Sequence, residues 1–384
     1  MKVWAAVFGV TIMALCRPVE ASPVPPVAAL EPIPAYIVAD STSGQILAAR
    51  RPDLRFVPAS LVKVMTAYTA FEEIAAGRLD PARTLIVSPA TFARWSGKGT
   101  SLYLRAGEAV SVDVLIHGIT TVSANDGAAV LAQGASGNIR DWTNLMNATA
   151  RRLGMTNSYF ATPNGWPDNG ATYVTARDLM TLGRALVTRH PALYARYFGK
   201  KSFRWNGIEQ RNRDPAIGVV PGADGIKTGY TREAGYGYLG SARRGDRRVI
   251  VVVAGAPSEA ARASAARAAL EWSFDAWRSV PAFSADQNVA RAKVQGGASP
   301  DVAVRVARPL SVAIPVEGLP SPVRLQLAYH GPVQAPVMKG QAIGVLTVSG
   351  VGAEPLRVPV VAAEAVSEAG VFDRLRNGLT GLLR

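Results

Sequence analysis

Three short patterns in the sequence combine residue types that could carry out nucleophilic catalysis. Ser60 stands three residues before Lys63, Ser123-Ala124-Asn125 comes next, and Lys227-Thr228-Gly229 is last. Each pattern alone arises often by chance, but all three in this order are much more specific. A second match to the middle pattern, Ser136-Gly137-Asn138, is interpreted as the chemistry of a helix end rather than as part of a site.

Ser60 and Lys63 have the spacing of a nucleophile and its base. A helix is predicted to begin at Ser60, and residues three apart lie on the same helix face. A serine hydroxyl reacts poorly until a neighbouring base takes its proton. Lys63 can be that base only as a neutral amine, and burial together with the charge of Lys227 would lower its pKa. Amides at the helix start could then stabilise an oxyanion.

The remaining patterns fit the rest of an acyl-transfer site. Ser123 could relay a proton to a leaving amine while Asn125 holds a substrate amide, and Lys227 and Thr228 could bind a substrate carboxylate. The simpler interpretations are an N-cap, a loop and a turn into a strand, and the three patterns together favour catalysis over them. No metal or cofactor is predicted, because Cys16 is the only cysteine and the three histidines are scattered. His117 is interpreted as a structural residue on an apolar helix.

Helices and strands are mixed up to about residue 283. We expect helices over residues 60–76, 112–120, 126–133, 138–153, 175–188 and 258–277. Strands are expected over 236–239 and 249–254, and a strand pair over 36–47 turns at Ser43-Gly44. The Lys227 pattern is expected to follow a glycine-rich turn and to precede a strand. Residues 35–283 are therefore predicted to be one α/β (α+β) domain.

A different pattern follows this domain. Apolar residues alternate with period two over residues 302–306, 312–316 and 323–329, with proline and glycine between them. This pattern predicts a small all-β sandwich over residues 284–363. No catalytic combination of residues occurs in it.

The two ends of the chain are typical of an exported protein. Residues 1–21 have the charge, the apolar run and the small-residue cleavage pattern of a signal peptide, and the five prolines of residues 22–34 predict an unstructured leader. Residues 364–384 place an apolar stripe at helical spacing beside arginines: Phe372, Leu375, Leu379, Leu382 and Leu383 with Arg374, Arg376 and Arg384. This stripe predicts a membrane-associating amphipathic helix, and the alternative is a helix docked on its own domain.

The amino-acid composition excludes fewer classes of function than the motifs do. Hydrophobic residues make up 48% of the 384 residues, which excludes a globally disordered chain. The net charge of +14 is spread over the whole length, so it gives little support to nucleic-acid binding, and none is expected.

The chain resembles the D-alanyl-D-alanine carboxypeptidases, which are low-molecular-mass penicillin-binding proteins. The likeness covers nearly everything after the leader, including the β module and the tail. It is carried by Tyr36–Leu47, Pro58–Lys63, Ser123–Asp126 and Asp224–Gly229. It implies a penicillin-recognising, transpeptidase-like α/β fold, followed by the β-sandwich and the amphipathic helix.

The resemblance also implies a role for each candidate residue. Ser60 would be the acylated nucleophile and Lys63 its base, with Ser123, Asn125 and Lys227 completing the core. The further substrate-binding positions would be Thr228, Gly229, Tyr230, Arg213 and Arg262. The oxyanion hole would be formed by the amides of Ser60 and Tyr230. Many members have histidine at the position of Tyr230, and a backbone amide is insensitive to that change.

The function expected on these grounds is serine-type removal of the terminal D-Ala from peptidoglycan stem pentapeptides. The partners would be those peptides, β-lactams that acylate Ser60, and the periplasmic face of the cytoplasmic membrane. Three alternatives share the motifs or the fold: a β-lactamase, an endopeptidase that cuts crosslinks, and a non-catalytic wall-binding protein. No extra glutamate of the penicillinase type is identified, and intact Ser60 and Lys63 argue against the third alternative.

Overall fold

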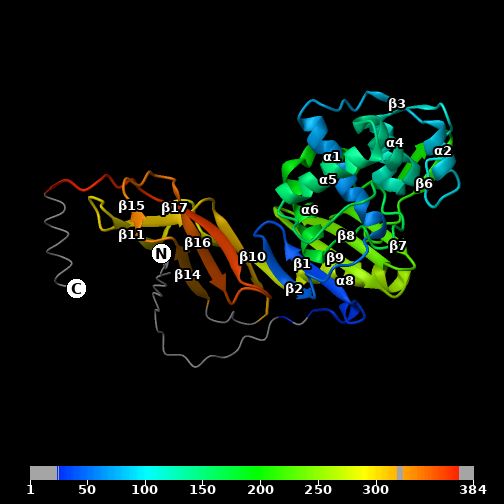
Figure 1. Cartoon of the computed structure of the whole chain (residues 1–384). Helices are drawn as coiled ribbons and strands as arrows, with labels where there is room; N and C mark the ends of the chain where they lie inside the picture. The colour runs from blue at the N-terminus through cyan, green and yellow to red at the C-terminus, as the bar shows by residue number, and fades with distance from the viewer. Residues whose placement is uncertain (1–23, 25, 318–322, 372–384) are drawn as a thin grey trace. The chain divides into compact units, whose positions relative to one another are not determined.

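The computed structural model describes residue 24 and residues 26–317 and 323–371, which form two compact units (Figure 1). The larger unit contains Pro26–Ser41 and Ala48–Phe274, and the smaller contains Thr42–Leu47 and the described chain from Asp275 onward. The predicted signal peptide lies outside the described residues. The leader was predicted to be unstructured, but Ala28–Leu30 form a 3₁₀ turn, and Leu30 and Ile33 are fully buried. Two apolar side chains thus hold this proline-rich segment against the domain.

A five-stranded sheet forms the centre of the larger unit. Its order is β2-β1-β9-β8-β7. The strands are β1 (Ala35–Asp40), β2 (Gln45–Arg50), β7 (Ala223–Thr231), β8 (Gly235–Arg244) and β9 (Arg247–Ala256). β1 pairs with β9, β9 with β8 and β8 with β7, all antiparallel. Every residue of β1 is buried, as expected for a strand covered on both faces.

One strand assignment was wrong. Lys227–Gly229 lie inside β7 rather than before a strand. Glycine disfavours strands, which hides β7 in the sequence. The structure needs a glycine at 229, because a Cβ there would lie 2.8 Å from the carbonyl oxygen of Pro58. This close approach brings β7 against the turn that carries Ser60.

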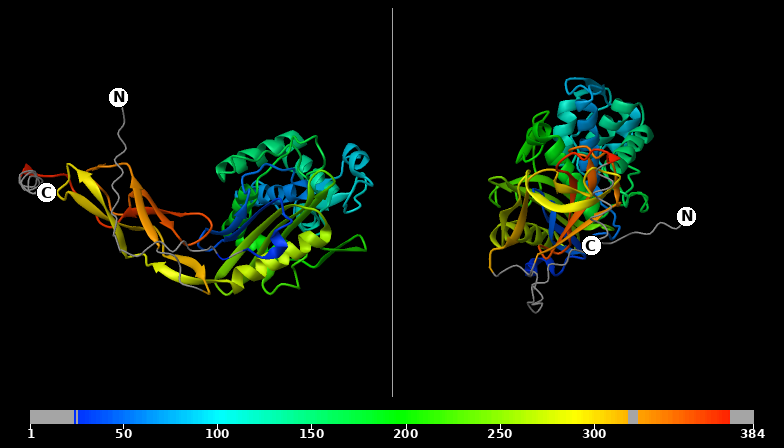
Figure 2. Two further views of the ribbon diagram at one scale, coloured as in Figure 1. Left: turned by 90° about the horizontal axis from the view of Figure 1, so that it is seen from below. Right: turned by 90° about the vertical axis from the view of Figure 1, so that its left-hand side faces the viewer.

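Helices cover both faces of the sheet. α6 packs on β1, β8 and β9, and α8 lies along the opposite face (Figure 2). The helices are α1 (Val62–Ala75), α2 (Pro89–Trp95), α3 (Val112–His117), α4 (Asn125–Ser136), α5 (Ile139–Arg152), α6 (Ala176–Arg189), α7 (Pro191–Tyr197) and α8 (Glu259–Asp275). Two short hairpins accompany them: β3 (Thr84–Ile86) with β4 (Ala109–Ser111), and β5 (Ser202–Trp205) with β6 (Ile208–Arg211). The six predicted helices are confirmed.

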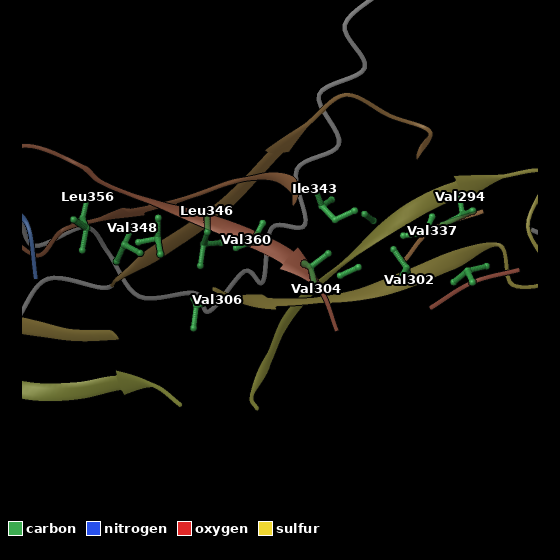
Figure 3. Packing of buried hydrophobic residues seen from close by; sticks show 14 of the residues in the cluster. Val294, Val302, Val304, Val306, Val337, Ile343, Leu346, Val348, Leu356 and Val360 are labelled. Carbon is green, nitrogen blue, oxygen red and sulfur yellow. The ribbon is translucent and has the colours of Figure 1, made fainter. Parts of the chain in front are cut away.

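The smaller unit is the predicted β module. A two-stranded sheet contains β10 (Trp277–Phe283) and β13 (Leu310–Pro315). A six-stranded sheet contains β14 (Arg324–Tyr329), β16 (Ala342–Ser349), β17 (Leu356–Ala362), β12 (Asp301–Val306), β11 (Asn288–Gln295) and β15 (Val333–Gln334), in that order. Valines from several of these strands converge in its core (Figure 3). The alternating apolar pattern identified this unit because one face of each such strand is buried.

The β module is longer at both ends than predicted. It begins with β10 at Trp277 rather than at residue 284. At the other end, Val366 bridges to Val337 and Glu368 to Gly297, and Val366 and Ala369 are buried. Residues 364–369 therefore belong to the module rather than to a separate tail. The apolar stripe predicted for the tail, from Phe372 onward, lies outside the described residues.

Candidate active site

Ser60 lies in a 3₁₀ turn, Ala59–Leu61, that leads directly into α1. Ala59 has a φ of 49°, in the left-handed region that non-glycine residues seldom occupy. Such strain costs on the order of 1–3 kcal/mol and is typical of functional sites. Gly165, from a distant loop, packs against the same turn, and a Cβ there would lie 1.8 Å from the carbonyl oxygen of Ala59. The turn is therefore fixed from outside the helix.

Lys63 is almost completely buried and makes three hydrogen bonds. Its Nζ lies 2.9 Å from Ser60 Oγ, 2.8 Å from Asn125 Oδ1 and 2.7 Å from the carbonyl oxygen of Asn164. The last two partners can only accept, so they take two N–H groups of the amine. In a neutral amine the remaining position is the lone pair, and it faces the serine hydroxyl. The surroundings therefore orient Lys63 as a base toward Ser60.

The electrostatic surroundings favour this neutral amine. Burial lowers the pKa of Lys63 well below its ordinary value, and the positive charge of Lys227 lowers it further. The Asp126 carboxylate acts in the opposite direction. Burial prevails because a desolvated ammonium loses its hydration without gaining an adjacent carboxylate as a hydrogen-bond partner.

Asn125 is the first residue of α4, and its side-chain amide is held at both ends. Oδ1 accepts from Lys63, and Nδ2 donates to the carbonyl oxygen of Lys98 at 3.1 Å. Ser123 precedes it with a φ of 67°, after a π-helical turn over Gly118–Val122. The hydroxyl of Thr100 donates to the Ser123 carbonyl at 2.6 Å. A strained serine after a π turn is a further sign of a functional site.

The alternative copy of this pattern is structural, as predicted. Ser136 is the last residue of α4, Gly137 has a φ of 85°, and Asn138 caps α5 by accepting from the amide of Asp141. His117 is also structural, because its ring stacks on Phe203 with centroids 5.5 Å apart.

Asp126 is a site residue to which the sequence analysis gave no role. Its buried carboxylate accepts from the Ser101 hydroxyl and from the amides of Leu102, Leu104 and Gly127. These bonds fasten the loop around residues 98–104 against the start of α4. The only sequence signal was an aspartate directly after Asn125.

Lys227 lies in β7 and is buried. Its Nζ donates to the carbonyl oxygen of Thr228 at 2.9 Å. Burial lowers the pKa of Lys227 to about 7, against the opposing effect of the Asp214 carboxylate. Asp214, which the sequence analysis missed, is held by the amides of Ala216 and Ile217. This lysine can therefore be a cation in the lower part of the neutral pH range.

The two predicted arginines lie within electrostatic reach of Lys227. The charges of Arg213 and Arg262 both lower its pKa. Arg262 is buried in α8 and pairs with Glu259 at 2.8 Å, whereas Arg213 is exposed. Tyr230 is about half exposed and stacks on Tyr236 with ring centroids 4.2 Å apart. The β7 segment thus joins the serine turn to a cationic region.

The structure brings some of the predicted residues into contact. Ser60, Lys63 and Asn125 share one hydrogen-bond network, and the strand carrying Lys227 touches the serine turn through Gly229. Asn164 was missed, because its contribution is a backbone carbonyl and any residue type supplies one. Within the described part of the chain, no three residues of ligating type are grouped so as to hold a metal ion.

The comparison with known families agrees with this geometry. Residues 27–258 match the family described as D-alanyl-D-alanine carboxypeptidase. The chain belongs to this family. Residues 277–368 match the C-terminal domain of penicillin-binding protein 5, so the carboxypeptidase has the β module as its second domain. It is a serine hydrolase with an α/β catalytic domain followed by a β domain.

Individual relatives resemble this carboxypeptidase over most of their length. It is 32% identical to D-alanyl-D-alanine carboxypeptidase DacC of Escherichia coli, over 89% of this chain and 86% of the relative. It is 31% identical to DacA of Haemophilus influenzae, over 88% of this chain and 86% of that relative. The crystal structure of penicillin binding protein 5 from Haemophilus influenzae has a TM-score of 0.77 and 29% identity, covering 90% of this chain and 99% of that one. Among the described residues, no helix is both long and apolar enough to cross a membrane.

Proposed function

We propose that this carboxypeptidase removes the terminal D-Ala from peptidoglycan stem pentapeptides through an acyl-enzyme on Ser60. The observation that carries the proposal is the network around Lys63. Its amine is buried, has a lowered pKa, and has two of its three positions occupied by acceptors, so the third faces the Ser60 hydroxyl. A base in this state is what a serine nucleophile without a histidine requires.

Acylation would proceed in two steps. Lys63 Nζ takes the proton of Ser60 as Oγ attacks the carbonyl carbon of the penultimate D-Ala. The resulting oxyanion accepts from the amides of Ser60 and Tyr230. Collapse breaks the peptide bond, and Ser123 relays the proton from Lys63 to the departing D-Ala amine, which leaves Lys63 neutral. In deacylation, water gives a proton to Lys63 as its oxygen attacks the ester carbonyl carbon. Collapse then breaks the bond to Ser60 Oγ, and Lys63 returns the proton to that oxygen.

The residues on and near β7 would bind the departing end of the substrate. The terminal D-Ala carries a carboxylate, and Lys227 and the Thr228 hydroxyl would hold it, with Arg213 and Arg262 adding positive charge. The charges of both arginines lower the pKa of Lys227, which supports the proposal that they add to the positive potential around it. Asn125 would hold the amide on the acyl side of the scissile bond.

β-Lactams would acylate the same serine, because their strained amide imitates the substrate. Penicillin-binding protein D2 from Listeria monocytogenes, 29% identical with a TM-score of 0.58 over 64% of this chain, has been solved in an ampicillin-bound form. We assign the corresponding adduct of this chain to Ser60.

The protein would act at the outer surface of the cytoplasmic membrane. The family is periplasmic in bacteria, in keeping with the predicted signal peptide. The apolar and arginine-rich stripe after residue 371 would attach it peripherally, since leucine and phenylalanine bury in the interface and arginine is drawn to anionic lipid.

One experiment separates this function from its alternatives. The purified protein is incubated with a stem pentapeptide, a crosslinked dimer and a fluorescent penicillin. A carboxypeptidase releases D-Ala and retains the label for a measurable time. A β-lactamase turns the penicillin over rapidly, an endopeptidase cuts the dimer, and a wall-binding protein does none of these. Failure to release D-Ala from the pentapeptide would refute the proposal.

A further inference from the structure

Asp214 carries a carboxylate that is enclosed by the protein but forms no ion pair among the described residues. Its Oδ1 accepts from the amides of Ala216 at 2.8 Å and Ile217 at 3.2 Å. Its Oδ2 is buried and has no hydrogen-bond partner in the described part of the chain. The Asp214 amide donates to Asn212 Oδ1 at 2.9 Å, which helps to fix the loop between β6 and β7. The carboxylate is therefore held in place, and no adjacent cation cancels its charge.

Tyr238 connects this carboxylate to the strand that carries Lys227. Its Cα pairs with that of Thr228 in the register of β8 and β7. The Tyr238 hydroxyl lies 3.3 Å from Asp214 Oδ1 and 3.2 Å from the carbonyl oxygen of Gly225, which is also in β7. Burial raises the pKa of Tyr238 well above its ordinary value, so the hydroxyl keeps its proton and remains a donor. Asp214 is therefore joined through one side chain to the part of β7 on either side of Lys227.

The charges that act on Lys227 come from three elements. Burial lowers the pKa of Lys227 to about 7, the cations Arg213 and Arg262 lower it further, and the Asp214 carboxylate raises it. Lys63 of α1 also interacts with Lys227, and it is neutral when it acts as the base. A buried ammonium near two arginines loses its proton readily unless a negative charge lies close by. Asp214 supplies that charge, because Coulomb attraction acts over several ångströms where water is excluded.

We propose that Asp214 is a positioning residue that keeps Lys227 an ammonium, ready for the carboxylate of the substrate. This role rests on the proposed function, in which Lys227 binds the carboxylate of the terminal D-Ala. A neutral lysine offers that carboxylate hydrogen bonds without charge, and a charge-assisted bond is roughly twice as strong. Burial raises the pKa of Asp214, whereas its two amide donors, the Tyr238 hydroxyl and Lys227 lower it. Asp214 and Lys227 thus hold each other in their charged forms, and this coupling sets the pH range in which the substrate binds.

The test removes the charge of Asp214 and keeps its shape. Asp214→Asn retains the Oδ1 acceptor and places the NH₂ group at Oδ2, the atom without a partner. A second variant combines Asp214→Asn with Lys227→Arg, because an arginine does not lose its proton and needs no counter-charge. The control is Asp178→Asn, whose buried carboxylate accepts from the Asn157 amide and the Ser158 hydroxyl and is not among the charges that act on Lys227. Two rates are followed between about pH 5 and about pH 10: kcat/KM for D-Ala release, and acylation by a penicillin, which also carries a carboxylate.

For Asp214→Asn we expect the fall of kcat/KM at high pH to begin about one pH unit lower than in the wild type. At about pH 8 this shift is a loss of about tenfold. The loss should lie in KM, with kcat nearly unchanged, because a bound substrate brings its own carboxylate to Lys227. Acylation by penicillin should shift in the same direction. The combined variant should show no fall at high pH, like Lys227→Arg alone, and Asp178→Asn should follow the wild type.

Two results would overturn the proposal. A fall at the same pH in Asp214→Asn as in the wild type would show that this carboxylate does not act on Lys227. A loss in Asp214→Asn that is equal at every pH, and that persists to the same extent when Lys227→Arg is added, would show that Asp214 only supports its loop. Failure of the proposed function is distinguishable from both, because the wild type would then release no D-Ala, while penicillin acylation would still report the pH shift.

Discussion

Asp126→Asn tests whether the buried carboxylate behind the catalytic asparagine holds the site together. Oδ1 accepts from the amides of Leu102 and Gly127, and Oδ2 accepts from the Ser101 hydroxyl and the amide of Leu104. In asparagine one of the two carboxylate oxygens is replaced by an NH₂ group, which donates and cannot accept, so this group must face donors of the loop. The Ser101 hydroxyl can rotate to accept from the NH₂ group, but the amide of Leu104 cannot.

The expected loss of stability follows from the one amide that is left without an acceptor. One buried amide without an acceptor costs about 1–3 kcal/mol, and exchanging a charged acceptor for a neutral one weakens the remaining bonds. We therefore expect the free energy of unfolding of the catalytic domain to fall by about 2–4 kcal/mol. The loop also supplies the Lys98 carbonyl that orients Asn125, so the rate of penicillin acylation should fall at least tenfold.

The assay is urea denaturation followed by residual penicillin labelling, which reports on the catalytic domain alone. Acylation rates are measured separately without urea. The control is Asp141→Asn: this aspartate is exposed, and its carboxylate accepts from Asn138 Nδ2. The control should shift the midpoint far less. If Asp126→Asn unfolds at the same urea concentration as the wild type and acylates at the same rate, the carboxylate neither fastens the loop nor positions Asn125.

Four further outcomes are expected. Ser60→Ala should abolish covalent labelling with the fold intact, and a penicillin adduct on this variant in mass spectrometry would disprove the assignment. Lys63→Arg should also be inactive, because arginine keeps the charge but cannot accept a proton; acylation within a few-fold of the wild type would contradict the base role. Acylation needs neutral Lys63, so its rate should rise with pH through the lowered pKa of that amine. Substrate affinity should fall above about pH 7, where Lys227 loses its proton. A pH profile of kcat/KM should therefore rise and then fall, and the fall at high pH should be absent in Lys227→Arg. Truncation after Val371, which preserves the bridge at Val366, should end liposome co-sedimentation without loss of D-Ala release; equal sedimentation of both forms would indicate a docked helix.

Much of the site could be read from the sequence, because its chemistry depends on local spacing. Ser60 and Lys63 are one helical turn apart, so any helix there brings them together. The alternation of valines after residue 300 likewise determines which strand faces are buried, and the β module was found on that basis. The helix expected over residues 175–188 begins with a residue type typical of a cap, and the hydroxyl of Thr175 accepts from the amide of Asp178.

Contacts between distant segments could not be read in this way. The acceptor that orients Lys63 is the carbonyl of Asn164, which lies 101 residues further along the chain. The strand β7 was hidden because glycines at 225 and 229 disfavour strands, yet Gly229 is required by the close approach of the Pro58 carbonyl. The leader looked unstructured because prolines dominate it, whereas its burial depends on a surface formed elsewhere.

The sequence by itself therefore determined which side chains react. The tertiary structure decided the protonation state and the orientation of those side chains. A lysine three residues from a serine is an ordinary ammonium until folding removes it from water. Burial and the charge of Lys227 then lower its pKa. Two acceptors, one at the start of α4 and one in the loop at Asn164, leave one direction open, toward Ser60. Desolvation and hydrogen-bond direction arise only when distant parts of the chain pack together, and no local pattern encodes them.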